Sequence, residues 1–350
     1  MSQSTVELRG VWKIFGARAG EALEAMGRAV MSKSEVLERF GCVVGVQDAS
    51  FSVAEGEVFC IMGLSGSGKS TLVRHINRLL EPTAGQVLIH GEDVMQKDAR
   101  QLRFLRAEKI GMVFQNVALL PHRTVADNVA LPLDVKGLCR RDREEIASRA
   151  LSLVELAGWE NYYAHELSGG MQQRVGLARA LAADPAILLM DEPFSALDPL
   201  IRRQLQDEFI RLSKVTGKTT VFITHDLDEA IRIGHRIAIM KDGVIVQIGT
   251  PEEIVTNPAD DYVADFVAGI SRLKLVYARS VMVPIEAYGN GLDGALSEAP
   301  RAADDSDLDH LIDLAVESDG PIVIEDAQDR AVGVVDRQHL LRGIQGGKSH

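Results

Sequence analysis

The chain has 350 residues, of which 46% are hydrophobic and 25% charged, a composition typical of a folded protein of about two domains. Its 38 basic and 50 acidic residues give a formal net charge of −12, which argues against a sequence-independent nucleic-acid binder, because such proteins need a basic surface. Its three cysteines are far apart and disfavour a zinc site and a disulfide framework (Cys42, Cys60 and Cys139). We expect no secretory signal in residues 1–10 and no membrane span, since the longest apolar runs fall far short of ~20 residues.

The N-terminal elements are a predicted strand over residues 6–15 and a helical insert over residues 17–45. Within the insert three apolar residues recur on one helical face (Leu23, Met26 and Val30). Residues 32–35, Ser-Lys-Ser-Glu, form a capping box that predicts a second short helix with Val36 and Phe40 on one face. A simple packing role is the preferred interpretation of this insert.

Three later segments are apolar on both faces and predict strands of a sheet that helices cover (57–62, 186–190 and 219–224). Residues 236–241 and 244–248 flank Asp242-Gly243, a typical hairpin signal. Thr250-Pro251-Glu252-Glu253 then predicts the capped start of another helix. The mixture of strands and helices indicates an α/β fold.

The composition changes near residue 270, where we place a domain boundary, with one domain over 1–270 and another over 271–350. The last 80 residues hold 8 basic and 14 acidic side chains, about half of the net negative charge of the chain. They contain two apolar segments that predict paired strands (320–326 and 331–336), and helices are expected before and after them (307–316 and 339–344). This pattern predicts a small α+β module.

A glycine-rich loop after the strand at 57–62 matches the phosphate-binding pattern G-x4-G-K-[ST] and precedes a helical pattern. Its backbone N–H groups and the following helix N-terminus suit phosphate oxygens. Lys69 is expected to reach the β- and γ-phosphates of ATP, and Ser70 to bind Mg²⁺. The nucleotide-binding residues predicted here are Gly63, Ser65, Gly66, Ser67, Gly68, Lys69, Ser70 and Thr71. The alternative is an ordinary Gly/Ser-rich loop; a dinucleotide is disfavoured because no third glycine has the required spacing.

Two carboxylates follow the strand at 186–190. Asp191 suits the coordination shell of Mg²⁺, directly or through water, and Glu192 is placed to act as a general base toward the attacking water. Acidic residues often follow strands, so this pair indicates a nucleotide site only in combination with the phosphate loop.

Residues 167–174, Leu-Ser-Gly-Gly-Met-Gln-Gln-Arg, form a second anion site at a helix start, with Ser168 as N-cap. With this segment the sequence resembles the ABC-type ATPases. The resemblance implies a P-loop NTPase fold with a RecA-like core, an antiparallel β portion and a helical subdomain over about 116–175. It also implies a head-to-tail homodimer in which Ser168, Gly169, Gly170 and Gln172 of one copy contact the ATP held by the other. Met171 stands where many members have glutamine.

The same resemblance assigns the remaining site residues. It implies that Gln115 contacts Mg²⁺ and takes part in catalysis, that Asp198 lies in the D-loop and contacts ATP, and that His225 contacts the γ-phosphate and takes part in catalysis. An aromatic ring near the first strand is expected to stack on adenine. Phe15 is preferred for this platform, and Phe40 is the alternative.

The stretches 75–79, 194–202 and 224–230 and the helical insert together resemble the ATPase subunits of glycine betaine/proline betaine/choline importers. This resemblance covers about residues 5–270. It implies an ATPase bound peripherally to transmembrane permease subunits at the cytoplasmic face of a bacterial inner membrane, with a substrate-binding protein as indirect partner and no nucleic acid. An importer ATPase for another small solute and a soluble ABC ATPase acting on nucleic acid are the alternatives.

The tail resembles one CBS module, with His339 where an aspartate often contacts a ribose and residues 282–284 as a remnant of a first module. We expect a role in dimerisation or in packing. Two basic clusters suit either anionic lipid or a solvated helix surface (Arg100, Arg103, Arg106 and Lys109; Arg140, Arg141 and Arg143).

Overall fold

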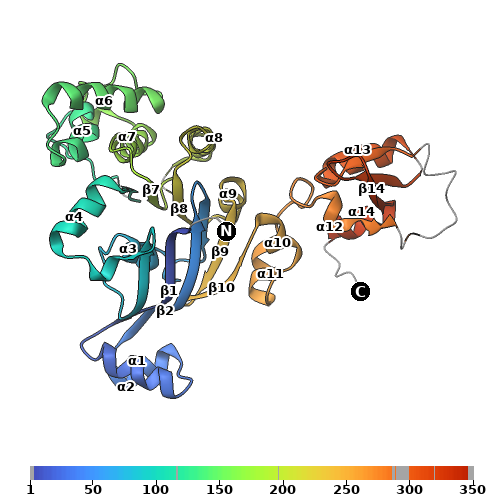
Figure 1. Ribbon diagram of the computed structural model, residues 1–350, viewed down its shortest axis with the longest axis horizontal. Helices are drawn as coiled ribbons and strands as arrows, with labels where there is room; N and C mark the ends of the chain where they lie inside the picture. The colour runs from blue at the N-terminus through green and yellow to red at the C-terminus, as the bar shows by residue number, and fades with distance from the viewer. Residues whose placement is uncertain are drawn as a thin grey trace. The chain divides into compact units, whose positions relative to one another are not determined.

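The computed structural model describes residues 4–115, 117–195, 197–285, 288, 299–318 and 320–345. The chain divides into two units, residues 1–248 and 249–350 (Figure 1). None of the described helices combines the length and the hydropathy that a membrane span requires.

The centre of the first unit is a six-stranded sheet with strand order β10-β9-β3-β8-β7-β6. The five strands from β9 to β6 pair in parallel, which places their carboxyl ends at one edge. Every residue of β3, β7 and β8 is buried, as their continuous apolar sequences predicted. The strands are β3 (Val58–Met62), β6 (Ile110–Val113), β7 (Ile187–Asp191), β8 (Thr219–Thr224), β9 (Arg236–Lys241) and β10 (Val244–Gly249).

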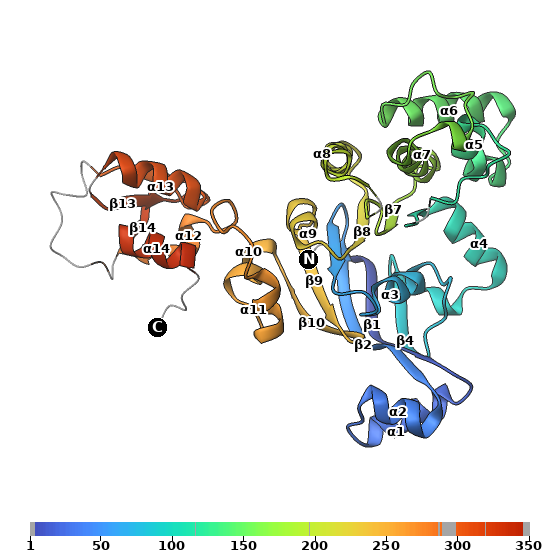
Figure 2. The same ribbon diagram turned by 180° about the vertical axis from the view of Figure 1, so that it is seen from behind.

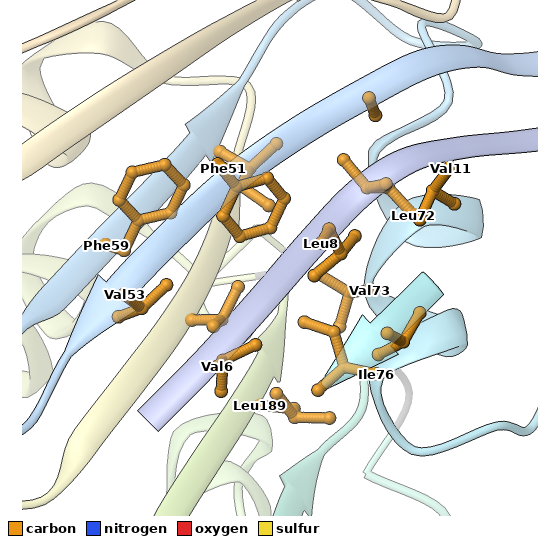
Figure 3. Packing of buried hydrophobic residues seen from close by; sticks show 14 of the residues in the cluster. Val6, Leu8, Val11, Phe51, Val53, Phe59, Leu72, Val73, Ile76 and Leu189 are labelled. Carbon is orange, nitrogen blue, oxygen red and sulfur yellow. The ribbon is translucent and has the colours of Figure 1, made fainter. Parts of the chain in front are cut away.

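A second, antiparallel sheet has strand order β2-β1-β4-β5. It consists of β1 (Ser4–Phe15), β2 (Val43–Ala54), β4 (Ala84–Ile89) and β5 (Glu92–Asp93). Phe51 of this sheet stacks on Phe59 of the parallel sheet with ring centroids 4.8 Å apart. Helix α3 (Lys69–Ile76) contributes Leu72, Val73 and Ile76 to the same core (Figure 3). The two elements that flank the phosphate loop, β3 and α3, thus pack in one continuous hydrophobic core.

The helices of the first unit form separate groups. Helices α5, α6 and α7 pack on one another at one end, and α1 and α2 lie at the opposite end (Figure 1 and Figure 2). The bounds of the helices are α4 (Ala99–Glu108), α5 (Val125–Val135), α6 (Arg140–Leu153), α7 (Gly169–Ala182), α8 (Pro199–Thr216) and α9 (Leu227–Ile233). The group α5–α7 corresponds to the predicted helical subdomain at 116–175, but α7 continues to Ala182, where its last turns contact β6.

The insert contains α1 (Ala19–Arg28) and α2 (Lys33–Phe40), and its last three residues, 43–45, already belong to β2. The capping box at Ser32 is confirmed, because Ser32 and Glu35 each bond to the other's backbone N–H group. Val36 is buried in a small satellite core, on which Leu23 and Met26 pack. The prediction for Val30 is wrong: its side chain is fully exposed because α1 ends two residues earlier.

The second unit contains a four-stranded sheet of order β11-β14-β13-β12 and five helices among its described residues. The predicted strand pair is confirmed as antiparallel β13 and β14, and Val283 of the expected remnant pairs with Val334 of β14 in the same sheet. The elements are α10 (Pro251–Thr256), α11 (Asp261–Val267), α12 (Ala278–Val281), β11 (Val283–Pro284), β12 (Arg301–Ala303), α13 (Leu308–Glu317), β13 (Ile322–Glu325), β14 (Ala331–Val335) and α14 (Arg337–Gln345).

The division between the units precedes α10, whereas the composition had suggested a boundary near residue 270. Glu252 of α10 explains the difference. Its Oε1 accepts hydrogen bonds from Ser280 Oγ at 2.6 Å and from the Tyr277 N–H at 3.2 Å, and its Oε2 pairs with Arg279 at 3.0 Å. One carboxylate therefore attaches the capped helix at 250–256 to the tail.

Candidate functional site

The phosphate loop lies between β3 and α3, as the sequence predicted. Gly63 and Gly68 have φ values of 152° and 102°, which L side chains rarely adopt. A Cβ atom at Gly63 would lie 2.2 Å from the carbonyl oxygen of Met240, and one at Gly68 would lie 2.4 Å from that of Gly45. Both positions therefore require glycine for backbone shape and for space.

The turn between β9 and β10 fixes the other side of this loop. The predicted hairpin at Asp242-Gly243 is confirmed, with φ values of 47° and 75°. The N–H of Gly243 donates to the carbonyl of Ser67 at 2.9 Å, and the carbonyl of Gly243 accepts from the N–H of Gln47 at 2.8 Å. The turn thus joins β2 to the phosphate loop and fixes one side of the loop by a backbone hydrogen bond.

Lys69 points back into the loop. Its Nζ donates to the carbonyls of Gly63 at 2.8 Å and Leu64 at 3.1 Å, and lies 3.7 Å from Glu192 Oε1. Burial lowers the pKa of Lys69, while the carboxylates of Glu192 and Asp191 oppose that shift. Ser67 Oγ is buried and has no partner among the described residues. A phosphate oxygen in the loop would supply that partner, so the residues present fit a phosphate group.

Ser70 and Asp191 meet beside the loop. Ser70 Oγ donates to Asp191 Oδ1 at 2.7 Å, and an Arg74 guanidinium nitrogen lies 3.5 Å from Asp191 Oδ2. The described residues contain no cluster of three acidic, histidine or cysteine ligands. Mg²⁺ in nucleotide sites takes only one or two protein oxygens besides phosphate and water, so this pair of oxygens fits that ion.

Glu192 and His225 approach one another from adjacent parallel strands. Glu192 follows β7 and His225 follows β8, and the two strands are paired. Glu192 has a left-handed backbone, with φ at 46°, and its N–H donates to the carbonyl of Ile223 at 3.1 Å. His225 Nδ1 lies 3.0 Å from Glu192 Oε2. One carboxylate therefore contacts both Lys69 and His225, and the strained backbone that places it is typical of functional sites.

Gln115 follows β6, the strand paired with β7, and its side chain is exposed. The sheet thereby brings Gln115, Asp191 and His225 to the ends of neighbouring parallel strands. Asn116, which follows it, lies outside the described residues.

The structure distinguishes the two candidate adenine platforms. Phe15 is 40% exposed, and its ring packs on Gly45, where a Cβ atom would lie 2.7 Å from the ring. Because the carbonyl of Gly45 touches Gly68, this ring lies next to the phosphate loop. The ring of Phe40 instead packs on the satellite core of the insert, and two guanidinium groups lie 5.2 and 5.6 Å from its centroid. Lys13 Nζ lies 5.1 Å from the Phe15 centroid, so cations border both rings, and the two rings differ chiefly in that Phe15 lies beside the phosphate loop.

The second anion segment is exposed. Ser168 is the N-cap of α7, and its Oγ accepts from the N–H of Met171 at 3.3 Å. Gly169 borders open space. The side chain of Gln172 donates to the carbonyls of Ala164 and Leu167 at 3.0 and 3.2 Å, so it stabilises the preceding turn. Asp198 caps α8 through the N–H of Ile201 at 3.1 Å, and Ala196 before it lies outside the described residues.

Sequence reasoning missed three residues of this region. Gly45 supports the Phe15 ring, Arg74 pairs with Asp191, and Arg202 donates to the loop before α8. Only Arg74 carried a usable signal, since it lies four residues after Ser70 and hence on the same helical face. In the predicted basic cluster on α4, Arg106 is already engaged within the protein, because it donates to the carbonyls of Asn77 and Arg78 at 2.8 and 2.6 Å.

Comparisons with known proteins agree with this geometry. The family model described as "ABC transporter" matches residues 46–195. The glycine betaine transport ATP-binding protein OpuAA of Bacillus subtilis is 48% identical, over 94% of this chain and 76% of its own length. The trimethylamine N-oxide transport system ATP-binding protein TmoW of Ruegeria pomeroyi is 45% identical, over 97% of both chains.

A solved structure extends the likeness to the fold. The dimeric structure of the ATP-binding cassette MJ0796 in a post-hydrolysis state, bound to ADP and Pi, is 34% identical with a TM-score of 0.59. It covers 70% of this chain and 98% of that chain. The chain therefore belongs to the ABC transporter family, as an ATP-hydrolysing subunit of the importer group that includes the glycine betaine transport proteins.

Proposed function

We propose that two copies of this chain bind and hydrolyse ATP with Mg²⁺ at shared sites and thereby drive import through membrane permease subunits. The observation that supports this most strongly is the contact of Glu192 with both Lys69 and His225, beside the pair formed by Ser70 and Asp191. An ordinary Gly/Ser-rich loop with only a structural role would not require these five side chains to lie together.

Lys69, Ser70 and the loop N–H groups bind and orient the triphosphate. When ATP enters, the Lys69 ammonium exchanges its contacts with two backbone carbonyls for phosphate oxygens, where its charge offsets charge that develops during phosphoryl transfer. Ser70, Asp191 and Gln115 would hold Mg²⁺, which neutralises phosphate charge when bound. Phe15 would stack on the adenine ring.

Glu192 accepts a proton from the attacking water, and His225 orients this carboxylate and contacts the γ-phosphate. The contact between them fixes the Glu192 carboxylate by one bond to His225 Nδ1 and leaves the other oxygen directed toward Lys69. Such orientation of the base before reaction lowers the entropic part of the barrier.

Ser168, Gly169 and Gly170 of one copy would contact the nucleotide held by the other, and Asp198 would lie in the same interface. The exposure of Ser168, Gly169 and Asp198 and the open space at Gly169 support a site that a second molecule completes. ABC importer subunits work as dimers with permeases, and we place this one at the cytoplasmic face of a bacterial inner membrane.

The proposed cargo is a small methylated amine, with glycine betaine, proline betaine or choline as first candidates. The relative named for glycine betaine supports them. Trimethylamine N-oxide is the second candidate, because the relative named for it matches nearly the whole length of both chains. The cargo itself would bind the permease and a separate receptor.

The tail is proposed to be a CBS-like module that packs against its counterpart in a second copy. Val316 of α13 and Leu341 of α14 are 78% and 58% exposed, an apolar surface that such packing would cover. His339 Nδ1 lies 2.8 Å from Asp336 Oδ1, so this histidine already has an acidic neighbour within the module.

Uptake of labelled cargo tests the proposal. Cells lacking this subunit are complemented with the wild-type chain or with Lys69→Ala, and uptake of choline, glycine betaine, proline betaine and trimethylamine N-oxide is compared. Restoration of one of them by wild type but not by Lys69→Ala supports both the cargo class and the dependence on ATP. Restoration of none, with ATP hydrolysis intact in the purified transporter, rules out the methylated-amine cargo.

A further inference from the structure

Arg202 occupies a position in α8 that does not favour a cation. Asp198 is the N-cap and the Arg202 N–H donates to its carbonyl at 2.9 Å, so Arg202 lies one turn from the helix end at which the dipole presents partial positive charge. Its side chain is only 27% exposed, and its Nε is buried without a partner among the described residues. A cation at this position requires acceptors that offset its unfavourable placement.

Those acceptors come from two separate loops. One Arg202 guanidinium nitrogen donates to the carbonyls of Ser195 and Leu197 at 3.4 and 3.3 Å, and the other donates to Asp226 Oδ2 at 3.4 Å. Ser195 and Leu197 belong to the loop that follows Glu192, and Asp226 follows His225 directly. Each bond is long, but together they join the segment after the proposed base to the segment after its histidine partner.

Further contacts close this arrangement into a ring. The N–H and the Oγ of Ser195 donate to the carbonyl of Glu192 at 3.3 and 3.1 Å. Asp226 is held by its N–H, which donates to Thr224 Oγ1 at 3.0 Å, and it caps α9 by accepting from the Glu229 N–H at 3.1 Å. Since His225 Nδ1 lies 3.0 Å from Glu192 Oε2, the ring begins and ends at Glu192.

We propose that Arg202 is a positioning residue for ATP hydrolysis: it bridges Ser195, Leu197 and Asp226 and so holds His225 against Glu192. The inference rests on the proposed function, because Glu192 must act on water for its orientation to matter. The His225 side chain is 50% exposed, so packing contributes little to its placement and the loop that carries it must be fixed from behind.

Steady-state ATP hydrolysis by the full-length chain, assembled with its permease, tests this role. Arg202→Met is expected to lower kcat about tenfold and to leave KM for ATP within about threefold, because orientation of the base is lost while the phosphate loop is intact. Arg202→Lys is expected to fall between, since an ammonium reaches fewer of the three acceptors. Arg203→Met is the matched control: it removes the same charge from the neighbouring exposed position and is expected to behave as wild type.

A second background separates positioning from general stability. In His225→Ala, adding Arg202→Met is expected to cost less than about threefold in the remaining rate, because no imidazole is left to position. A full tenfold loss there, or a folded Arg202→Met with unchanged kcat, overturns the inference. If Arg202→Met does not fold, Asp226→Asn in both backgrounds gives the same comparison, since asparagine still caps α9 but binds the guanidinium less strongly.

The wild-type rate distinguishes this inference from the proposed function. If the wild-type complex hydrolyses no ATP, the proposed function fails and the role of Arg202 fails with it. If wild type and Arg203→Met hydrolyse ATP equally and Arg202→Met matches them, only the positioning role is lost.

Discussion

The phosphate loop and the segment at 168–170 are both proposed anion sites at helix starts, yet their surroundings differ. Lys69 and Asp191 are 4% and 3% exposed, and the loop accepts a hydrogen bond from the N–H of Gly243. Ser168 and Gly169 are exposed, and Gly169 borders open space. The phosphate loop is therefore enclosed by residues of its own chain, whereas the segment at 168–170 lies open to another molecule, as the proposed dimer requires.

The largest predicted effect comes from replacing Glu192, the proposed general base beside the phosphate loop. Glu192→Gln is expected to lower hydrolysis about a thousandfold, because an amide cannot take the proton from water. ATP binding is expected to persist, since the contacts of Lys69 with the phosphates do not need the carboxylate. Nucleotide binding measured by equilibrium dialysis, beside the hydrolysis rate, checks both statements, and a parallel loss of binding and hydrolysis would contradict them.

A charged side chain at Gly169 is expected to disrupt the function of the exposed segment at 168–170. Gly169→Glu is expected to lower hydrolysis at least about a hundredfold by repelling the partner's nucleotide, with no change in the melting temperature. Gly20→Glu, in the insert, is the matched control because Gly20 also borders open space.

Mixed dimers sharpen this test. A dimer of Lys69→Ala and Gly169→Glu chains contains one site with neither lesion, so co-expression is expected to restore part of the activity that each variant lacks alone. Failure of mixed dimers to form an active site would place the segment at 168–170 outside the nucleotide site.

A smaller effect distinguishes the two candidate adenine platforms, Phe15 and Phe40. Phe15→Ala is expected to raise KM for ATP about tenfold, since base stacking contributes roughly 1–3 kcal/mol, and to change kcat little. Phe40→Ala is expected to leave KM unchanged and to lower the free energy of unfolding by about 2 kcal/mol, because this ring packs on the insert core. The opposite assignment of the two effects would make Phe40 the adenine platform.

The smallest effect concerns Glu208, a buried carboxyl of α8 that pairs with Arg174 of α7. Burial raises the pKa of Glu208, although Arg174 of α7, 3.6 Å away, opposes the shift. A raised native pKa means that stability is lost as pH rises through that value, so Glu208→Gln is expected to stabilise the protein near neutrality. The gain in free energy of unfolding from Glu208→Gln, less than about 1 kcal/mol, is expected to shrink as the pH falls toward the ordinary glutamate range. Chemical denaturation at several pH values checks this, with exposed Glu145→Gln as control; an advantage that grows in acid would contradict it.

Local sequence signals predicted the elements that depend on neighbouring residues. The buried strands β3, β7 and β8, the capping boxes at Ser32 and Thr250 and the turn at Asp242 depend on apolar runs and on short-range hydrogen bonds, and all are present. The phosphate loop and Asp191 were predicted for the same reason, because the loop directly follows β3 and Asp191 ends the apolar run of β7.

The remaining features depend on contacts between distant segments. No local pattern announces that Glu192 adopts a left-handed backbone, or that Arg202 turns away from solvent to bridge two loops. The choice between Phe15 and Phe40 depends on cross-strand packing, since the Phe15 ring rests on Gly45 of the paired strand β2. Val30 was misplaced because the pattern did not reveal that α1 stops at Arg28.

The turn at Asp242-Gly243 has a consequence for engineering the protein. Exposed hairpin tips are usually the first choice for inserting tags, reporter domains or random libraries, because they tolerate added residues. Here the backbone of Gly243 bonds both to Ser67 of the phosphate loop and to Gln47 of β2. An insertion at this tip, far along the sequence from the loop, would remove its clamp. The connection between α1 and α2, where Val30 is fully exposed, offers a safer point of attachment.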